Sequence, residues 1–559
     1  MSQTTAPREA GELPPSGLPN GLPRCIASPV RIGRVVSVSG GRVIALLERM
    51  DDRAADVQVG ALVKIVRPTA LVFGIVEGLS IPIPRDEPGE HELPIAEINL
   101  LGEVPDAVPG AVRSFRRGVS STPALDDAVL AADSDDTAAV YALPERQAVR
   151  IGTVHQDSTV SAYVSVDDLL ARHFAIVGAT GSGKSCALAL ILQGIIEANP
   201  NGHILLLDPH GEYGKAFGER AEHLTVSRLR LPYWILNFEE LTEIFFGAEK
   251  DGLAAETQCL RQLVLKARLA YAQGKRDCAT IEVDTPTPYT LSEVSRLLDE
   301  EMGRIDNRST LGPYLRVKAR LATLQADPRY AFLFPKGLAM RDNLASLLGQ
   351  LFRVPTDGKP LCILDLVGVP TEVLNAVVAV LCRMAFDVAV SAGHRLPLLL
   401  VCEEAHRYAP QDSGLGFEPA KRSLARIAKE GRKYGISLGM VSQRPSDLAV
   451  SILSQCSTVL AFRMVNDADQ EVIQAALSDV SSALVTSLPL LGNGEAVIVG
   501  EGVSVPMRLH LAQLPPDRRP RSSSSSFSRR WQNDEADLSV LESIVDCWRG
   551  LKQDRVAQT

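Results

Sequence analysis

Short apolar segments alternate with longer stretches of helical periodicity in the part of the chain that follows residue 150. Apolar runs of this length, bounded by turn residues, are typical of buried strands. The apolar segments are Ala175–Val177, Ile204–Leu207, Leu361–Leu366, Leu398–Cys402, Ile436–Val441 and Thr458–Phe462. Strands that alternate with helices predict an α/β domain with a mostly parallel sheet.

The N-terminal part has a different pattern, in which short β-rich runs are separated by turn residues such as Ser39-Gly40-Gly41. The runs are Gly33–Val38, Arg42–Leu47, Leu62–Val66 and Leu71–Val76. Their spacing predicts a small closed β-barrel. Residues 123–145 are rich in Ala and Asp, which favours a solvated connector.

Two further segments complete the organisation of the chain. Between the second and third predicted strands of the α/β domain, Leu260, Leu263 and Ala267 recur at helical spacing, which indicates a helical insertion. Near the C-terminus, Arg518–Arg530 holds serines between arginines and predicts a flexible linker before a last amphipathic helix. We therefore expect a loose N-terminus at 1–25, a β-barrel at 26–118, a connector at 119–149, the α/β domain at 150–515 with its insertion at about 240–350, the linker at 516–533 and the C-terminal helix at 534–559.

The most apolar long segment, Val373–Val390, contains Asn375, Arg383 and Asp387 toward one side of a helix. This pattern predicts a helix packed on a sheet, because a membrane span needs about 20 residues nearly free of charge. Residues 1–24 lack the apolar core of a signal peptide. Nine scattered cysteines without a C-x-x-C pair indicate a reducing cytoplasm and argue against a zinc site or a disulfide framework.

A phosphate loop, G-x-x-x-x-G-K-S, directly follows the first apolar strand of the α/β domain. Its backbone N–H groups point at phosphate oxygens, Lys184 reaches the outer phosphates, and the Ser185 hydroxyl ligates Mg²⁺. A flexible glycine linker would need neither the Lys-Ser pair nor the strand and helix on either side. The loop predicts ATP or GTP binding by Gly178, Ala179, Thr180, Gly181, Ser182, Gly183, Lys184, Ser185 and Cys186.

Paired carboxylates, Glu403 and Glu404, follow the apolar strand Leu398–Cys402 in the pattern of a Walker B strand. We expect Glu403 to hold Mg²⁺ through its water shell and Glu404 to orient and deprotonate the attacking water. The first carboxylate of this motif is more often Asp. The alternative is that both are merely polar residues at a strand end.

Two further polar residues follow predicted strands and face the same edge of the sheet. Asp208 follows Ile204–Leu207 and is a candidate partner for water or Mg²⁺, although Asp-Pro also commonly forms turns and caps helices. Gln443 follows Ile436–Val441 and is placed to sense the γ-phosphate or the water. Its alternative is a hydrogen bond to loop backbone.

A basic helix, Pro419–Lys433, precedes the strand that ends near Gln443. A charge run is usually a solvated face. Its position beside the catalytic strands favours another role, in which Arg432 reaches the ATP of a neighbouring subunit and accelerates hydrolysis by about 10³- to 10⁵-fold.

Taken together, these motifs and the flanking Ile151-Gly152-Thr153, Glu430–Gly435 and Ser442–Pro445 segments resemble the HerA family of hexameric ATPases, which are related to the FtsK DNA pumps. The resemblance spans about residues 26–514. It implies a RecA-like ATPase core behind a β-barrel shared in form with ATP-synthase subunits, and ATP with Mg²⁺ bound between subunits of a homohexamer. It also implies double-stranded DNA in a central pore and Arg172 and Arg432 near the phosphates.

The resemblance further implies a partner, either a NurA-type nuclease in DNA-end processing or an effector in antiviral defence. We therefore expect a cytoplasmic, ATP-driven, sequence-nonspecific DNA translocase or helicase. The net charge of −9 does not advertise nucleic-acid binding, although a ring needs basic residues only along its pore. Alternatives are a conjugation or packaging ATPase, disfavoured by the lack of membrane spans, and an ATP-dependent scaffold that licenses a nuclease with little translocation.

Overall fold

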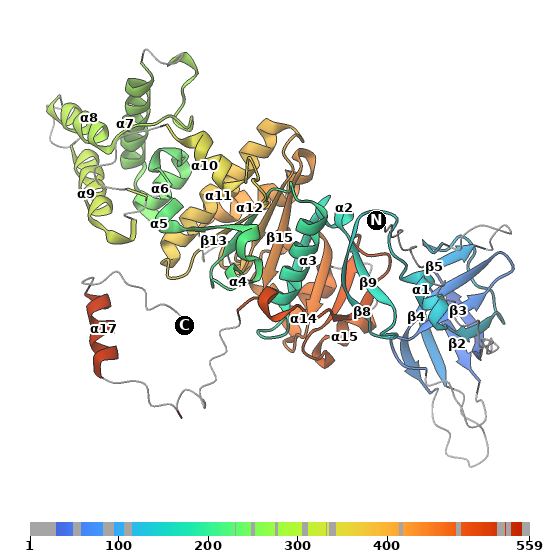
Figure 1. Ribbon diagram of the computed structural model, residues 1–559. Coiled ribbons are helices and arrows are strands. Elements are labelled where there is room, and N and C mark those ends of the chain that lie inside the picture. The colour runs from blue at the N-terminus through green and yellow to red at the C-terminus, as the bar shows by residue number, and fades with distance from the viewer. Residues whose placement is uncertain are drawn as a thin grey trace, which may run out of the picture. The chain divides into compact units, whose positions relative to one another are not determined.

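The computed structural model describes residues 30–48, 57–81, 94–105, 114–229, 231–247, 252–273, 278–304, 311–330, 333–334, 342–412, 417–476, 482–521, 532 and 538–549. The chain divides into two compact units, Met1–Ala142 and Leu143–Thr559 (Figure 1). Each unit has its own sheet and its own hydrophobic core.

The first unit is an antiparallel barrel. Its strands are β1 (Arg31–Ser39), β2 (Arg42–Leu47), β3 (Leu62–Val66), β4 (Ala70–Ser80), β5 (Ile95–Pro105), β6 (Arg116–Arg117) and β7 (Ala128–Ala131). The sheet order is β2-β1-β7-β3-β4-β5-β6, and β2 also pairs with β5, which closes the barrel. Side chains that alternate along the strands, among them Val35, Ile65 and Ile98, fill its core.

The predicted barrel is confirmed, but the connector expected at 119–149 is not a plain connector. It contributes β7 between β1 and β3, followed by helix α1 (Ser134–Val140). The acidic residues that suggested solvation have local partners, because Asp133 caps α1 and both Asp133 and Asp136 pair with Lys64 of β3. The acidic residues of this segment therefore serve helix capping and ion pairing.

The second unit is built on one long sheet. Its strands in spatial order are β12 (Ala221–Thr225), β13 (Leu361–Asp365), β11 (Ile204–Asp208), β14 (Leu398–Cys402), β15 (Ile436–Ser442), β10 (His173–Val177), β16 (Cys456–Phe462), β17 (Glu495–Gly500), β18 (Met507–Leu511), β8 (Ala148–Val154) and β9 (Ser161–Ser165). The strands from β12 to β16 are parallel, and those from β17 to β9 extend the sheet in antiparallel fashion. The predicted α/β architecture is therefore confirmed.

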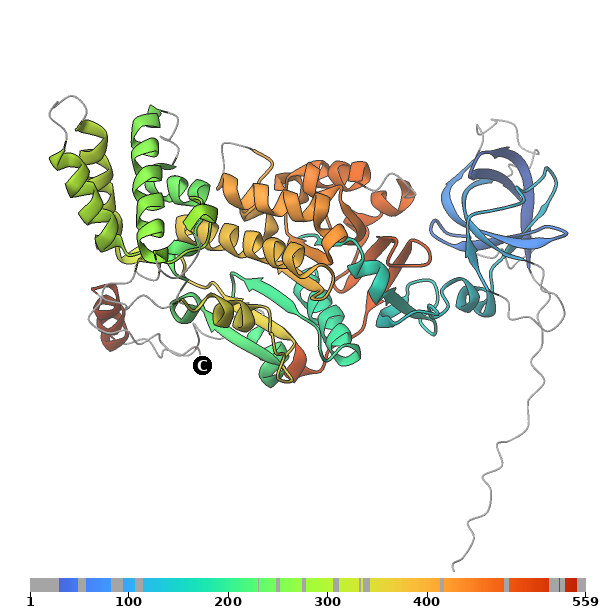
Figure 2. The same ribbon diagram turned by 90° about the horizontal axis from the view of Figure 1, so that it is seen from above.

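Helices cover the parallel part of this sheet. Helix α3 (Lys184–Ala198) follows β10, α11 (Thr371–Ala392) follows β13, and α12 (Glu418–Glu430) packs beside α11 (Figure 2). Among the described residues α11 is the one helix long and apolar enough to cross a membrane, and 78% of its apolar window is buried inside the fold. This agrees with the prediction of a helix packed on a sheet.

The helical insertion leaves the sheet after β12 and returns at β13 (Figure 1). Its helices are α5 (Val226–Leu229), α6 (Phe238–Phe246), α7 (Ala254–Ala272), α8 (Leu291–Gly303), α9 (Gly312–Ala326) and α10 (Leu344–Leu351). Its apolar side chains belong to the same core as those of α11, and Arg383 of α11 pairs with the buried Glu240 of α6. The insertion is thus fixed to the α/β core.

The segment expected to be a flexible linker begins as an ordered strap. Residues Leu514–Arg521 lie along α3, where the Gln193 amide donates to the carbonyl of Arg518 and Arg518 pairs with Glu197. The last described helix, α17 (Leu538–Trp548), falls where a C-terminal helix was expected. The serines between strap and helix lie outside the described residues.

Candidate active site

The phosphate loop connects the buried strand β10 to α3, which begins at Lys184. Gly178, Gly181 and Gly183 have φ angles of 145°, 74° and 124°, a region that side chains with a Cβ rarely adopt. A Cβ on Gly178 would also lie 2.5 Å from the Cβ of Phe462. The glycines therefore allow both the curl of the loop and its close approach to β16.

The loop is held closed by its own polar groups. The Ala179 N–H donates to the Arg463 carbonyl at 2.9 Å, and the Ala179 carbonyl accepts from Ser182 Oγ at 2.7 Å and from Lys184 Nζ at 2.9 Å. Lys184 is buried, and burial lowers its pKa although Glu403 and Glu404 act in the opposite direction. Its ammonium thus rests on a neutral acceptor and is available to phosphate.

Glu403 lies at the end of β14 with 4% of its surface exposed. Burial, followed by repulsion from Glu404, raises its pKa to about 8, and its Oε2 has no hydrogen-bond partner among the described residues. A buried carboxylate oxygen without a partner is costly unless a cation balances it. Together with the Ser185 hydroxyl at the start of α3, this oxygen donor fits the preference of Mg²⁺ for oxygen ligands.

The carboxylate of Glu404 is the centre of a polar network. Gln443 donates to Glu404 Oε1, and Thr180 of the phosphate loop donates to the other end of the Gln443 amide. His210 Nε2 lies 3.4 Å from Glu404 Oε1, and His406 Nδ1 lies 3.4 Å from Glu404 Oε2. Side chains that follow β11, β14 and β15 therefore meet beside the loop.

This network fixes the position of the predicted sensor residue. Gln443 bonds two side chains, whereas the alternative considered for it was a bond to loop backbone. Glu404 itself has a φ of 53°, which is uncommon for a residue with a side chain. Such backbone strain is often found at functional sites, where the surrounding structure maintains it.

Asp208 is placed at the expected edge of the sheet but uses its carboxylate on the backbone. Oδ1 accepts from the N–H groups of His210, Gly211 and Glu212 at 3.3, 2.8 and 3.3 Å, and Oδ2 accepts from Tyr213 at 3.0 Å. This geometry is that of the turn-forming alternative, in which Asp208 shapes the loop that carries His210.

Arg172 and Arg432 are not brought to this site. Arg172 precedes β10 and pairs with Glu501 at 2.7 Å, and Arg432 lies in the short turn of helix Gly431–Tyr434 that precedes β15. A strand of five residues, such as β10, spans about 17 Å, so each arginine lies at the edge opposite the phosphate loop. Arg432 lines a hollow of about 820 Å³ there, together with Arg395.

The sequence did not predict two features beside the site, which are a pair of histidines and the strap. His210 and His406 stand inside recognised motifs, but only the fold shows that both face Glu404. The strap was missed because its arginines resembled a linker, whereas the Arg521 N–H donates to the Glu212 carbonyl at 2.9 Å. The strap therefore supports the same loop that Asp208 shapes.

A phosphate loop, a buried carboxylate pair on a neighbouring strand end and a parallel sheet flanked by helices define a P-loop ATPase of RecA-like fold. The family model for the central domain of helicase HerA matches residues 149–385. The chain is 27% identical over 502 residues to the DNA double-strand break repair helicase HerA of Pyrococcus furiosus, covering 84% of each chain. It is 24% identical over 536 residues to that of Saccharolobus solfataricus, covering 93% of this chain and 94% of that one.

Among solved structures, VirB4 of Thermoanaerobacter pseudethanolicus matches 67% of this chain and 100% of its own with 14% identity and a TM-score of 0.49. The plasmid coupling protein TrwB in complex with a non-hydrolysable ATP analogue matches 68% of this chain and 92% of its own, with 14% identity and a TM-score of 0.45. The family model and the relatives that match most of this chain show that it is similar to the HerA helicases over most of its length.

Proposed function

We propose that this protein is an ATP-driven, sequence-nonspecific translocase or helicase of double-stranded DNA that works as a homohexameric ring. The proposal rests on one observation, which is that the groups expected to act in ATP hydrolysis lie at two opposite edges of one sheet. The phosphate loop and the carboxylate pair lie at one edge, and Arg172 and Arg432 lie at the other. Relatives named DNA double-strand break repair helicase support the choice of DNA.

The residues of one chain supply most of the hydrolytic chemistry. The loop N–H groups and Lys184 bind the phosphates, and Ser185 and Glu403 hold Mg²⁺, which when bound offsets phosphate charge. Glu404 accepts the proton of the attacking water. Gln443 orients that water and, through Thr180, links its position to the phosphate loop.

The two histidines position the base. His210 and His406 approach different oxygens of Glu404, so each oxygen of the carboxylate has a histidine neighbour. His406 Nδ1 also lies 3.1 Å from Ser442 Oγ, which fixes its ring. A base held in this way loses little orientational freedom when it takes the proton.

Arg432 completes the site of the next subunit in this proposal. It lies at the edge of the sheet opposite its own phosphate loop, and its exposed side chain lines the hollow where a second copy would bring its phosphate loop. Arg172 is a second candidate at the same edge, although in one chain it is held by Glu501. An arginine brought to the phosphates by a neighbour stabilises the charge of the transition state.

Subunit mixing tests the shared site. Lys184→Ala and Arg432→Ala proteins are each expected to be nearly inactive, because every site in either ring lacks one group. Mixed rings contain sites with an intact loop facing an intact Arg432, so mixing is expected to restore ATPase activity. Mixtures that exchange subunits, shown by native mass spectrometry, and remain inactive would contradict the shared site.

DNA movement needs its own assay. We propose that the motor displaces streptavidin from a biotinylated duplex end in an ATP-dependent manner and at equal rates on unrelated sequences, since contacts to backbone phosphate carry no sequence information. Displacement that depends on one sequence would contradict nonspecific binding.

The N-terminal barrel holds the ring together or docks a nuclease, either of NurA type or a defence effector. It has no phosphate loop of its own in the sequence.

A second candidate function is favoured by the acidic balance of the chain, with 67 acidic and 58 basic residues. Under this alternative the ring is an ATP-dependent scaffold that organises and licenses a partner nuclease and moves DNA little. Hydrolysis that ignores bare duplex DNA but rises with the partner would favour the scaffold.

A further inference from the structure

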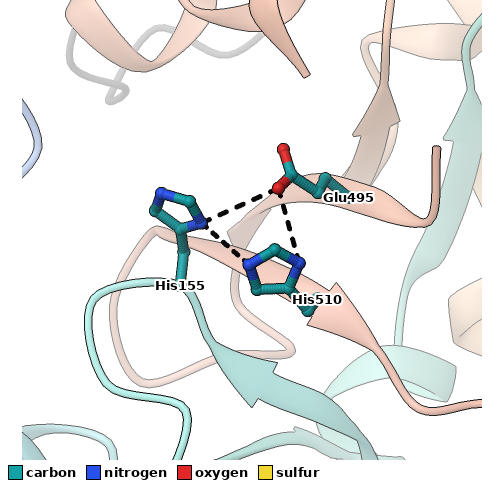
Figure 3. A group of neighbouring side chains, drawn as sticks. All are labelled: His155, Glu495 and His510. Atoms are coloured by element: carbon teal, nitrogen blue, oxygen red, sulfur yellow. Dashed lines mark hydrogen bonds and ion pairs between the residues drawn. The ribbon is translucent and has the colours of Figure 1, made fainter. Parts of the chain in front are cut away.

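Three side chains that could ligate a metal meet away from the carboxylate pair, on the antiparallel part of the sheet (Figure 3). Glu495 begins β17 and lies opposite His510 of β18. His510 in turn lies opposite Thr153 of β8, and His155 directly follows β8. Paired neighbouring strands thus fix the group, which gives more precise positions than loops do.

The two imidazoles face each other closely. His155 Nδ1 lies 3.0 Å from His510 Nε2, and Glu495 Oε1 lies 3.9 Å from His155 Nδ1. Two nitrogens each about 2.0–2.1 Å from a tetrahedral ion are about 3.3 Å apart. The separation of the two nitrogens therefore suits a common ion after a shift of a few tenths of an ångström.

Glu495 is oriented toward the rings by its other oxygen. Oε2 accepts from the Gly492 N–H at 3.0 Å and from Arg508 at 2.6 Å. The other oxygen, Oε1, faces the His510 ring and lies 3.4 Å from His510 Nδ1. A histidine that ligates a metal commonly donates its second ring N–H to a carboxylate, which leaves the opposite nitrogen with a lone pair for the metal.

We propose that His155 and His510 form a binding site for a divalent transition metal of the zinc class, with His155 Nδ1 and His510 Nε2 as ligands and Glu495 as the carboxylate that orients His510 and offsets the charge of the ion. Imidazole and carboxylate suit zinc, cobalt and nickel, whereas Mg²⁺ prefers oxygen alone. The proposal departs from the expectation of no zinc site, which rested on cysteines and on sequence spacing. The ligands here are separated by hundreds of residues and meet only in the sheet.

The site lies next to the phosphate loop through the turn that ends at Gly494. The Gly494 N–H donates to the Ser182 carbonyl at 3.0 Å, and the Gly494 carbonyl accepts from the Leu511 N–H at 2.8 Å. A bound ion would tie β8, β18 and the first residue of β17 together and so stiffen the turn that supports the loop. Metal binding itself needs neither ATP nor DNA, so it stands apart from the proposed motor function.

The test is metal binding by the full-length protein after removal of metals with a chelator, without nucleotide. Calorimetry with Zn²⁺ is expected to show one ion per chain. His155→Ala and His510→Ala are each expected to weaken binding about 10- to 100-fold. His223→Gln, which removes an exposed imidazole of β12, and Lys184→Ala, which disables the phosphate loop, are expected to bind as the parent does.

Absorption spectra with Co²⁺ identify the ligand type. Nitrogen and oxygen ligands give visible bands without the near-ultraviolet charge-transfer band of a thiolate, so the exposed Cys186 and Cys278 can be recognised if they bind instead. The proposal is overturned if the parent binds no Zn²⁺, if both histidine variants bind it as tightly as the parent, or if the thiolate band appears. In any of these cases the two rings share only an N–H···N hydrogen bond.

Discussion

Substitution of Asp208 separates two roles that the sequence left open. The Asp208 carboxylate is 1% exposed and accepts backbone N–H groups from the four residues that follow Pro209. Asp208→Asn keeps one oxygen for His210, Gly211 and Glu212. It turns the acceptor that faces the Tyr213 N–H into an amide donor.

The cost follows from these contacts. One buried donor is left unpaired, which costs about 1–3 kcal/mol. Burial raises the pKa of Asp208 while the backbone N–H groups lower it, so removal of a costly buried charge offsets part of the loss. We expect about 1–2 kcal/mol for Asp208→Asn and more for Asp208→Ala, which leaves every one of these N–H groups without its partner.

Hydrogen exchange measures this cost locally. A loss of about 1–2 kcal/mol in opening free energy speeds exchange of the amides of residues 210–213 by about 5- to 30-fold. Affinity for a fluorescent ATP analogue is measured in parallel, with and without Mg²⁺. If exchange in the nucleotide-free protein stays at the parental rate while Asp208→Asn loses Mg²⁺-dependent affinity, Asp208 is a partner of the metal and its assignment to the loop is wrong.

Three further predictions follow from single contacts. Glu404→Gln is expected to lower kcat about 10²- to 10⁴-fold and to keep nucleotide binding, because the shape of the side chain stays and the base is lost; parental turnover would contradict the role of Glu404. Gly178→Ala is expected to abolish binding of a fluorescent ATP analogue, since the new Cβ would lie 2.5 Å from Phe462. The control Gly218→Ala is expected to bind the analogue normally, because Gly218 also has a positive φ, 49°, but its Cβ would enter open space. Arg383→Met is expected to lower the free energy of unfolding by about 3–5 kcal/mol, because it leaves the buried Glu240 unpaired. The double variant Arg383→Met with Glu240→Gln is expected to recover part of this stability in thermal unfolding. Equal losses in both variants would refute the ion-pair argument.

The sequence predicted those elements whose local pattern reflects their surroundings. Among the buried parallel strands, β14 is apolar throughout and β11 is apolar up to Asp208, because helices cover both faces of the sheet. Edge strands do not have this property. In β12, Glu222 and His223 are partly or fully exposed beside buried Ala221 and Leu224, and the strand was missed.

The parts of the site that lie in contiguous motifs could be predicted from the sequence. The parts that the fold brings together from distant segments could not. The phosphate loop and the Glu403-Glu404 pair are contiguous, so their residue types alone predicted their chemistry. The contacts of His210 with Glu404 depend on the order of β11 and β14 in the sheet, which only long-range pairing fixes. The group of His155 and His510 depends in the same way on β18 pairing with β8.

The central claim is that ATP hydrolysis drives movement on DNA. The most direct measurement is the ATPase rate with and without linear duplex DNA, at two salt concentrations, for the parent and for Lys184→Ala. We predict stimulation by DNA that falls with salt, as backbone phosphate contacts require, and that disappears in Lys184→Ala. Hydrolysis at the same rate with and without DNA would contradict the motor and favour the partner-controlled scaffold.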